Sequence, residues 1–541
     1  QLAVVYLEGF QATQQPLYRQ VAVQTLDYVL REMTSPEGGF YSASDADTEG
    51  EEGKYFCWSH EEIMGHLGEV AGQRFCAYYG VLPRGNWEGK NVLYVPQALH
   101  QVAAQLGVDA EMLGRELEES RIKLFEARRQ RVAPAVDTKV VAAWNGMMIQ
   151  ALAEGFRVLG EERYLDAALR AADFVAAQLT TAEGRLRRSY CQGESRGSGF
   201  LEDYAWMAEG LLSLYEAGGR FSDFERAQQL VARIEQHFSA EDGGFFETSD
   251  DHEELIVRHR SGTDGAQPAA QGVAALALVR MAAHLGRAEM RERGLQVLTS
   301  VGKEMRQVAA GFCKYLQALD FALAGPVEVV ICAEPRPRTP LVEALALHYL
   351  PNRMLAWGSS EKHPKAMGKP SDKPALYCCQ SGVCAEPVLQ ADDLGAVLAN
   401  LRQHVRFELM PRVLRPIASW DPPVSRSARW ALAATGSTMK TWSISRRCAR
   451  PSRPESICSI LPATIPTEVA SVCLAGCCES FVNAATSWWS SARSAMSRAP
   501  TWTSPGPASR SVAPTRIWSP TRRDAGIAFT PSSWPISWSG A

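Results

Sequence analysis

Acidic side chains crowd one short stretch near the start of the chain, EGGFYSASDADTEGEE at residues 37–52. Two glycines and two aromatic residues precede most of its carboxylates. Three interpretations compete for this stretch: a catalytic carboxylate cluster, a cation site and a solvated acidic loop. The first is chemically specific, because cleavage of a glycosidic bond needs one protonated carboxyl group to assist the leaving oxygen and one ionised carboxylate to activate water or attack.

Candidate carboxylates come from three parts of the sequence. Asp45 and Asp47 follow the aromatic pair of the first stretch, Asp250 lies in a second acidic stretch, and Asp203 lies in LEDYAW. We predict these four residues as catalytic, on the expectation that acids from different loops face each other across one cavity. The competing interpretation is a solvated loop acid or, for Asp203, a group that favours the positive end of a helix dipole.

Aromatic and polar side chains near these acids could hold a sugar. Aromatic faces can stack on sugar rings, while an imidazole or a guanidinium can orient a substrate hydroxyl group. The predicted substrate-binding residues are Trp144, Asn145, Tyr204, Trp206, Phe245, His252 and Arg258. The competing interpretation places the aromatic side chains in the core and the two basic side chains in surface ion pairs.

Neither a metal nor a cofactor is predicted. DADTEGEEG lacks the full spacing of a calcium loop, and the group Cys378, Cys379 and Cys384 lacks two further ligands for zinc. We interpret these cysteines as buried structural thiols. The other cysteines of the body are scattered, which is typical of a reduced, cytosolic protein.

Charge divides the sequence into an acidic body and a basic tail. Residues 403–541 hold 15 Arg and one Lys against four Glu and two Asp, a net charge of +10, which leaves −14 for residues 1–402. Nine of the chain's 14 Trp also lie in the tail, which shows neither helical nor strand periodicity. We predict that the tail is disordered and comes from a shifted reading frame or read-through. A basic arm that binds nucleic acid is the rival interpretation.

Helical hairpins dominate the body. Amphipathic patterns with the helical period occur in pairs over residues 2–33, 140–179, 201–239 and 269–305. Repeated hairpins of about 40–60 residues predict either an open α/α solenoid or a closed α/α barrel.

The segments between the hairpins repeat as well. SPEGGFYSASDAD at residues 35–47 and SAEDGGFFETSDD at 239–251 share an acid, two glycines and two aromatic residues, and TTAEGRLRRSY at 180–190 is a weaker copy. We number these segments by their order in the chain: residues 35–47 are the first connector, 180–190 the second and 239–251 the third. In a closed barrel the connectors would meet at one mouth.

The pattern changes at about residue 325. PVEVVICAE and NRMLAWGS predict strands, with LVEALALHYL as a helix between them, so we predict a small β-α-β appendage. ALYCCQSGVCAEP is predicted to be a turn bounded by cysteines, and DDLGAVLANLRQ a last short helix.

A chain of long motifs resembles a known family, the bacterial and eukaryotic thioredoxin-domain-containing proteins related to spermatogenesis-associated protein 20. The motifs span almost all of residues 1–400: GGFYSASDADTEGEEGKYFCW, GNWEGKNVL, DTKVVAAWNGMMIQALAEG, GFLEDYAWMAEGLLSLYEA, DGGFFETSDDHEELIVR, DGAQPAAQGVAALAL and YCCQSGVC. The resemblance implies a six-hairpin glycosidase-like (α/α)6 domain. It also implies a preceding thioredoxin-like domain that this sequence lacks, so we expect a fragment that begins inside the first hairpins.

One run departs from that family's pattern. Where the family has Pro-Ser-Gly-Asn, this chain has Pro268, Ala269, Ala270 and Gln271. The change removes a hydroxyl group and an Asn amide from an expected mouth position.

The predicted fold is therefore mainly α. We expect an (α/α)6 barrel-like toroid of helical hairpins over residues 1–324, a small α/β C-terminal appendage over 325–402 and the tail over 403–541. The predicted function is carbohydrate-related: hydrolysis, epimerisation or binding of a small carbohydrate at an acidic, aromatic mouth. The alternative is a non-catalytic scaffold or partner-binding module of a thioredoxin-like protein.

The predicted location is the cytoplasm, with neither nucleic acid nor a membrane as a partner. The basic tail contains no recognisable nucleic-acid-binding module, and no apolar run approaches the roughly 18 residues of a membrane span.

Overall fold

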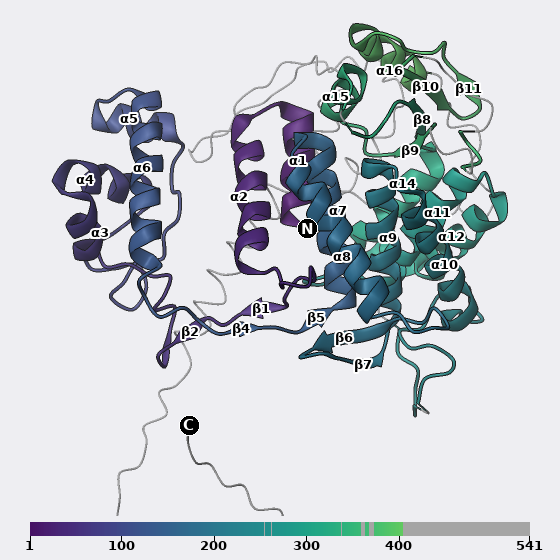
Figure 1. Cartoon of the computed structure of the whole chain (residues 1–541), viewed down its shortest axis with the longest axis horizontal. Helices are drawn as coiled ribbons and strands as arrows, with labels where there is room; N and C mark the ends of the chain where they lie inside the picture. The colour runs from purple at the N-terminus through teal and green to yellow at the C-terminus, as the bar shows by residue number, and fades with distance from the viewer. Residues whose placement is uncertain (254, 261, 337, 359–362, 367–372, 404–541) are drawn as a thin grey trace, which may run out of the picture. The chain divides into compact units, whose positions relative to one another are not determined.

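Four helical hairpins carry most of the structure. The computed structural model describes residues 1–253, 255–260, 262–336, 338–358, 363–366 and 373–403. The predicted tail from residue 404 onward lies outside these residues. The hairpins pair α1 (Leu2–Thr13) with α2 (Pro16–Glu32), α7 (Ala142–Leu159) with α8 (Glu162–Gln178), α9 (Leu201–Gly218) with α10 (Phe221–Phe238), and α11 (Ala270–Leu285) with α12 (Ala288–Ser300) (Figure 1).

The first helices of the hairpins form a continuous row. Helix α1 packs on α7, α7 on α9 and α9 on α11, and the row continues with α14 (Cys313–Ala324) against α11. A short helix, α13 (Gly302–Gln307), and the 3-10 turn η1 (Ala309–Phe312) lead into α14. The predicted pairs of helices are confirmed, and the fold is mostly helical.

Burial distinguishes the two helices of a hairpin. Helices α9 and α11 are buried on almost every side, whereas α10 buries only Phe224, Ala227, Val231 and Ile234 and their neighbours along one stripe. A helix apolar on one stripe is typical of an outer layer, and one buried all round of an inner layer. The hairpins therefore form two layers, with α9 and α11 in the inner one. Among the described residues, no helix is long and apolar enough to cross a membrane.

Two glycines let the inner helices α7 and α9 approach closely. A Cβ atom added to Gly146 would meet the backbone of Trp206, and one added to Gly210 would meet the backbone of Gly146. The small residue that follows Asn145 in the sequence thus makes room for a neighbouring helix.

The turns of the three connectors share one backbone conformation. In each, a bridge joins two residues six positions apart: Thr34 to Phe40, Thr180 to Leu186, and Ser239 to Phe245. The same two hydrogen bonds close each turn, for example from Gly38 N to Ser35 O at 3.0 Å and from Ser35 N to Gly39 O at 2.8 Å. The second connector, a weak copy in sequence, is a full copy in structure, so the predicted repeat is confirmed.

Each connector is tied to the next inner helix by the same kind of hydrogen bond. The backbone N–H of the residue after the turn donates to a side chain in the first turns of that helix. The pairs are Phe40 N with Asn145 Oδ1 at 2.8 Å, Leu186 N with the Tyr204 hydroxyl at 2.9 Å, and Phe245 N with Gln271 Oε1 at 2.8 Å. We call these three side chains the connector anchors.

The third anchor, Gln271, is the last residue of the run that departs from the family's Pro-Ser-Gly-Asn, and its position shows the structural effect of that departure. Gln271 supplies an amide oxygen in the position where Asn145 supplies one in the first connector. The expected loss of an amide from the mouth is therefore not seen, because the longer Gln side chain retains the structural hydrogen bond.

A separate helical cluster follows the first connector. Its helices are α3 (His60–Leu67), α4 (Glu69–Tyr78), α5 (Leu99–Leu106) and α6 (Ala110–Arg128), packed around their own core of Trp58, Ile63, Phe75, Leu113 and others. The chain enters this cluster through β1 (Ala43–Ser44) and leaves it through β4 (Val136–Asp137), which pair antiparallel. The hairpin of β2 (Asp47–Thr48) and β3 (Glu51–Glu52) lies in between. The sequence reasoning did not anticipate this cluster.

A small sheet extends the second connector. Strand β6 (Arg187–Cys191) pairs antiparallel with β7 (Glu194–Ser198) and with β5 (Val140–Val141), which leads directly into α7. The sheet thus joins the starts of two neighbouring hairpins.

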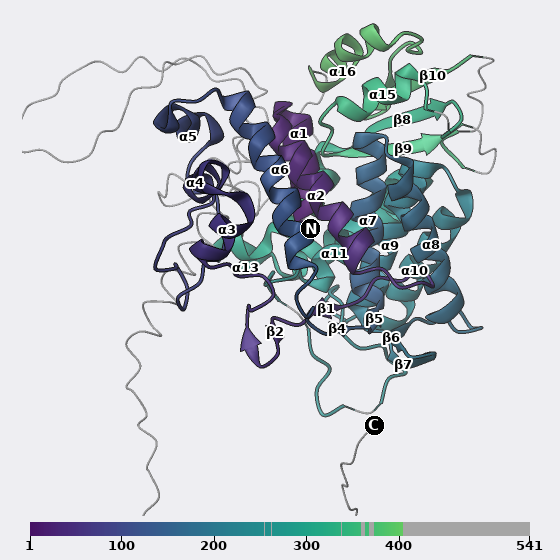
Figure 2. The same ribbon diagram turned by 60° about the vertical axis from the view of Figure 1, so that its left-hand side comes forward.

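The predicted β-α-β unit is present after α14. Strands β8 (Val327–Cys332) and β9 (Arg353–Trp357) are parallel, with α15 (Pro340–Leu347) between them. Strands β10 (Ala375–Gln380) and β11 (Val383–Cys384) extend the sheet in the order β11-β10-β8-β9, and the turn η2 (Ala391–Asp393) leads into α16 (Leu394–Gln403). Strand β9 contacts α9 and α11, and Figure 2 shows it near the upper ends of α7 and α9.

The cysteine prediction needs correction. ALYCCQSGVC forms a hairpin whose strands flank a turn at Ser381 and Gly382, both with positive φ, as type I′ turns require. This register sets Cys379 directly opposite Cys384, and the two form a disulfide. The pair is therefore not two separate structural thiols, whereas Cys378 is buried and lies outside this disulfide.

Buried charges join the α/β unit to the helices. Glu216 on α9 bonds to Arg280 at 3.0 Å, to His284 at 3.1 Å and to the backbone N–H of Leu355 on β9. Burial alone would raise the pKa of Glu216, but the neighbouring Arg280, His284 and Arg353 together lower it to about 2. An ionised carboxylate thus receives donors from both parts of the fold.

Loss of a connector anchor should destabilise the protein. Asn145 is fully buried and also donates to the buried Phe40 O and the part-buried Val141 O, so Asn145→Ala removes a hydrogen-bond partner from three backbone groups, two of them buried. At about 1 kcal/mol or more for each group, we expect the free energy of unfolding to fall by about 3 kcal/mol in urea denaturation. The exposed Gln236→Ala on α10 should change it by less than about 0.5 kcal/mol. Equal effects of the two substitutions would contradict the anchor role.

Candidate functional site

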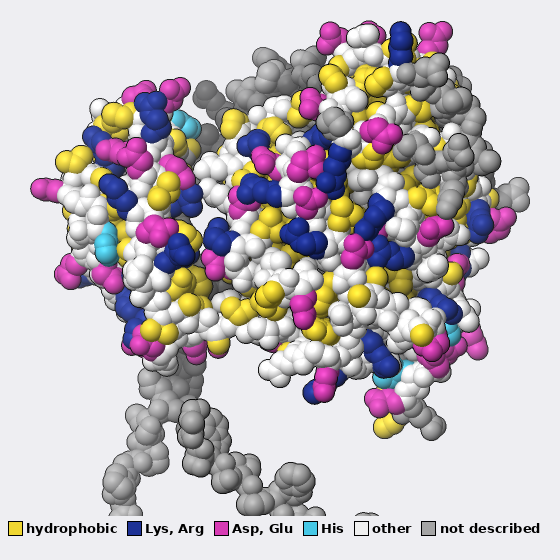
Figure 3. Space-filling model, viewed as in Figure 1, with side chains coloured by type: hydrophobic (Ala, Val, Ile, Leu, Met, Phe, Trp, Pro, Cys, Tyr) yellow, Lys and Arg dark blue, Asp and Glu magenta, His cyan; other side chains and the backbone are white. Residues whose placement is uncertain are grey.

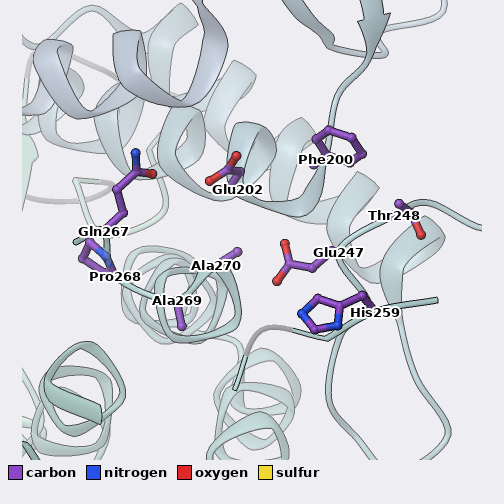
Figure 4. A pocket seen from close by; sticks show the side chains of 9 residues that line it. All are labelled: Phe200, Glu202, Glu247, Thr248, His259, Gln267, Pro268, Ala269 and Ala270. Atoms are coloured by element: carbon purple, nitrogen blue, oxygen red, sulfur yellow. The ribbon is translucent and has the colours of Figure 1, made fainter. Parts of the chain in front are cut away.

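A pocket of about 420 Å³ opens beside the connectors. Figure 4 shows the residues that line it: Phe200, Glu202, Glu247, Thr248, His259, Gln267, Pro268, Ala269 and Ala270. They come from the start of α9, the third connector, the loop after it and the start of α11. The volume is within the roughly 300–1,000 Å³ typical of small-molecule sites.

Two carboxylates and an imidazole lie in this pocket. Figure 4 shows the Glu247 carboxylate and the His259 ring side by side, both turned toward Ala270 at the start of α11. The backbone supports this arrangement, since Glu247 N donates to His259 O at 2.9 Å and Leu201 N donates to Glu247 O at 2.8 Å. Glu247 is thereby held between the start of α9 and the loop that carries His259.

Arg188 links the second connector to the acids at the start of α9. Its guanidinium forms ion pairs with Glu202, which lines the pocket, and with Asp203, at 3.0 Å from both carboxylate oxygens. Arg188 is two residues beyond the bridged Leu186, as Glu247 is two residues beyond Phe245. Equivalent positions of two connectors therefore both act at this pocket.

Asp203 has a structural position beside the pocket. Its fully buried carboxylate accepts from Phe200 N at 2.9 Å and from Ala143 N, on the neighbouring helix α7, at 2.9 Å. Burial raises the pKa of Asp203 to about 6, although Arg188 and the backbone donors act in the opposite direction. Asp203 thus fixes Arg188, and through it Glu202, without lining the pocket itself.

Phe200 provides the aromatic surface of the pocket. The His252 ring stacks on it, with centroids 5.7 Å apart and planes 25° apart, and the Arg188 guanidinium lies 5.2 Å from its centroid. His252 therefore supports a pocket residue, as a neighbour and not as a lining residue. Arg258 donates to the backbone oxygen of Thr248 and stacks over Phe246, so it holds the third connector in place.

The predicted catalytic acids do not gather in the pocket. Asp45 and Asp47 are exposed, because the first connector turns away through β1 and β2 toward the α3–α6 cluster. Asp250 pairs with His237 at 2.8 Å. The connectors share a turn but diverge after it, so equivalent acids point to different places.

Three of the predicted substrate-binding residues have structural roles, and a fourth is partly exposed outside the pocket. Asn145 and Tyr204 are connector anchors, and Phe245 is a fully buried core residue under the Arg293 guanidinium. The polar groups or rings of these three residues are occupied within the fold, and none of the three lines the pocket. Trp144 is 37% exposed on the first turn of α7 and does not line the pocket.

Sequence reasoning missed Glu202, Glu247, His259 and Phe200. Glu247 lies in the motif GGFFETSDD, but the catalytic prediction uses Asp250, in the denser acidic run that follows. The connectors can be aligned on their bridged residues, Phe40, Leu186 and Phe245. Glu247 is then equivalent to Arg188 and Ser42, which marks its position. Glu202 was visible beside Asp203 in LEDYAW, and the helical spacing gave no reason to prefer it.

A possible metal-binding group lies outside the pocket. His237, Asp250 and Asp251 place ligand atoms within 4.8 Å of one another. These groups already have partners, since His237 bonds to Asp250 and Arg185 bonds to Asp251 at 2.8 Å. The hydrogen bond from Arg185 lowers the pKa of Asp251. Two of the three side chains are exposed, and nothing among the described residues points to a bound ion there.

Acidic and basic side chains are interspersed on the face shown in Figure 3. Ion pairs between surface side chains of the described residues include Arg163 with Asp27 at 3.0 Å and Arg336 with Asp166 at 2.9 Å. Exposed pairs of this kind each contribute at most about 1 kcal/mol. This face therefore has no dominant charge that would select a ligand, in contrast to the pocket.

Comparison with curated proteins establishes homology. The chain is 30% identical over 446 residues to human spermatogenesis-associated protein 20, an alignment that covers 74% of this chain and 57% of the human protein. It is 29% identical to the mouse protein, with 56% of that protein covered, and 28% identical over 406 residues to an uncharacterised protein of Caenorhabditis elegans. The chain is thus homologous to spermatogenesis-associated protein 20 and spans just over half its length. No protein-family model matches the chain.

Solved structures give weaker matches. A sugar epimerase from a ruminal bacterium aligns with 15% identity and a TM-score of 0.28, covering 51% of this chain and 71% of that one. A D-mannose isomerase aligns with 14% identity and a TM-score of 0.29, covering 55% and 74%. An inactive variant of a Salegentibacter α-1,6-mannanase in complex with α-1,6-mannotriose aligns with 11% identity and a TM-score of 0.27, covering 62% and 92%. Scores of this size do not establish a shared fold, so the function must be argued from the site.

Asp203 should make stability depend on pH. Its pKa of about 6 in the folded protein exceeds its ordinary value of 3.8, so the folded state binds its proton more tightly than the unfolded chain does. That stabilisation is complete below about pH 3.8 and is lost as the pH rises through about 6. Asp203→Asn has no such titration. The difference in free energy of unfolding between wild type and variant should therefore shift by about 1 kcal/mol, against the wild type, from about pH 5 to about pH 7.

Urea denaturation of both proteins at the two pH values measures this difference. A difference that stays constant would contradict the raised pKa, because with an ordinary or lowered pKa Asp203 is ionised in both the folded and the unfolded state throughout this pH range.

Proposed function

We propose that this protein is carbohydrate-active: it binds a sugar in the pocket beside the connectors and hydrolyses or epimerises it. The observation that carries this proposal is the presence of two carboxylates, Glu202 and Glu247, in one concave site with the His259 imidazole and the Phe200 ring. Glu202 and Glu247 are the proposed acid–base pair. His259 is a third group able to transfer a proton.

The chemistry of these groups fits both reactions. Hydrolysis of a glycosidic bond requires two carboxyl groups that flank the bond. Epimerisation requires one group to remove a proton and another to return one to the opposite face of the carbon atom, which carboxylates and imidazoles do in enzymes. Each carboxylate can also accept hydrogen bonds from sugar hydroxyl groups, and Phe200 can pack against the apolar face of a sugar ring.

Thr248 adds a polar group to the site. Its hydroxyl oxygen is buried and has no hydrogen-bond partner among the described residues, and Thr248 lines the pocket. Buried polar atoms nearly always have partners. A ligand hydroxyl group would provide one.

The proposed fold of the complete array is a six-hairpin toroid. Four hairpins in a row, with α14 continuing the row, support a ring whose connectors lie at one mouth. The alternative of a non-catalytic scaffold keeps the same fold but assigns the pocket no turnover. We propose that the protein acts in the cytoplasm on a small carbohydrate.

Removal of either pocket carboxylate should abolish turnover. A panel of mono- and disaccharides is first screened for a rise in melting temperature, and NMR spectra of the mixtures then show hydrolysed or epimerised products. For a sugar that is converted, Glu247→Gln and Glu202→Gln should each lower the rate at least about 100-fold, because general acid–base catalysis contributes roughly 10²–10⁴-fold. Both variants should retain the melting temperature to within a few degrees.

Glu241→Gln is the matched control, because Glu241 is an exposed acid of the same connector and lies outside the pocket. Its rate should equal that of the wild type. Full turnover in Glu247→Gln would contradict the assignment of the site. Binding without conversion of any sugar would favour the scaffold.

A further inference from the structure

One face of α9 carries polar side chains along its whole length. Glu202, Trp206, Glu209, Ser213 and Glu216 follow one another at spacings of four and three residues, which places them on one stripe of a helix. We call this set the α9 stripe. Its first member lines the pocket and its last contacts the α/β unit.

Ser213 and Glu216, the deep half of the α9 stripe, both have hydrogen-bond partners. Arg280 on α11 bonds to Glu209 Oε2 at 2.7 Å, to the Ser213 hydroxyl at 3.3 Å and to Glu216 at 3.0 Å. A guanidinium with its five donors suits this role. The deep half therefore needs no ligand.

The middle of the α9 stripe is not satisfied. The Trp206 indole nitrogen and the second carboxylate oxygen of Glu209, Oε1, are buried and have no hydrogen-bond partner among the described residues. The side chains are nine-tenths or more buried, with Trp206 2% exposed and Glu209 0%. Buried polar groups nearly always have hydrogen-bond partners, so a buried donor and a buried acceptor left unpaired three residues apart on one helix point to a missing partner.

The surroundings favour a polar, neutral partner. Helix α11 presents Ala270, Val273 and Ala277 before Arg280, at the same spacing of three and four residues, and Ala270 lines the pocket. None of these three apolar side chains can pair with the Trp206 indole N–H or with the Glu209 carboxylate. The ammonium group of Lys314 lies 5.2 Å from the Trp206 ring centroid. It already supplies a positive charge near Glu209, so we expect the ligand group to be neutral.

We propose that Trp206 and Glu209 form an inner subsite of the pocket that binds a hydroxyl group of the sugar. The indole N–H donates to the hydroxyl oxygen, and the hydroxyl group donates to Glu209 Oε1. A hydroxyl group satisfies both atoms, because it both donates and accepts. This inference rests on the proposed function, since it places the inner end of the same sugar.

The helix geometry sets the size of that sugar. Trp206 and Glu209 follow Glu202 by four and seven residues, which corresponds to about 6 and 10 Å along the helix axis. A ligand that contacts Glu202 and this inner subsite therefore extends along α9 from the mouth inward. The substrate class is a monosaccharide or the end of a short saccharide that enters with its terminal ring first.

The indole N–H resonance of Trp206 tests this subsite directly. The full chain is labelled with ¹⁵N at the indole nitrogen of tryptophan, and the Trp206 resonance is identified by its loss in Trp206→Phe. Lys314→Met, which removes the cation over the ring, identifies the same resonance by its shift if Trp206→Phe does not fold. D-glucose, D-mannose and cellobiose are then titrated while melting temperatures are recorded in parallel.

The proposal predicts a saturable shift of the Trp206 resonance with the same Kd as the rise in melting temperature. Trp206→Phe keeps an aromatic ring but lacks the donor, and should weaken sugar binding about tenfold. Glu225→Gln, an exposed change on α10, should bind as the wild type does.

Two negative results have different meanings. Sugars that raise the melting temperature while the Trp206 resonance stays unchanged and Trp206→Phe retains full affinity would overturn the inner subsite and leave the proposed function standing. If none of the sugars binds at all, both proposals fail.

Discussion

The hydrogen bond from each connector to the next inner helix is the constraint on which the rest of the structure depends. A backbone N–H immediately after a glycine turn has to find an acceptor once it is buried. The chain supplies that acceptor from Asn145, Tyr204 or Gln271. Every connector is thereby fixed to the hairpin that follows it, and the end of the helical array that carries the connectors becomes a rigid frame for the pocket.

Three different side chains meet this requirement, which explains why the repeat is stronger in structure than in sequence. An amide of either length or a phenol hydroxyl can accept one hydrogen bond from the turn. The glycines are less exchangeable, since Gly38, Gly184 and Gly243 all adopt positive φ. What lies beyond the turn is free to vary, and it does: one connector leads to the α3–α6 cluster, one to a β-hairpin and one to the pocket.

The α9 stripe connects the pocket to the interior. Burial of several carboxylates on one helix is unfavourable unless each finds donors. Arg188 provides them at the mouth and Arg280 at the deep end. In the middle, the Trp206 indole N–H and Glu209 Oε1 have no hydrogen-bond partner among the described residues, and these two groups match a hydroxyl group. The polar and charged side chains of the α9 stripe therefore form a continuous row from the pocket mouth to the interior.

Much of the fold was predictable from local pattern, and the site was not. Periodicity identified the hairpins and the β-α-β unit, because their apolar residues recur at helical and strand spacing. The α3–α6 cluster was not predicted, since its sequence contains no copy of the hairpin motif. The disulfide of Cys379 and Cys384 depends on a hairpin register that spacing alone does not reveal. The acids of the pocket depend on where the third connector turns after Phe245, and that path is set by contacts with distant residues such as Arg258.

The most direct test of the account is a crystal structure of the chain soaked with a sugar that raises its melting temperature. We predict that the sugar lies in the pocket beside the connectors, with hydroxyl groups within hydrogen-bond distance of Glu202 and Glu247 and its ring against Phe200. Density for the sugar at another place on the protein, with this pocket empty, would contradict it.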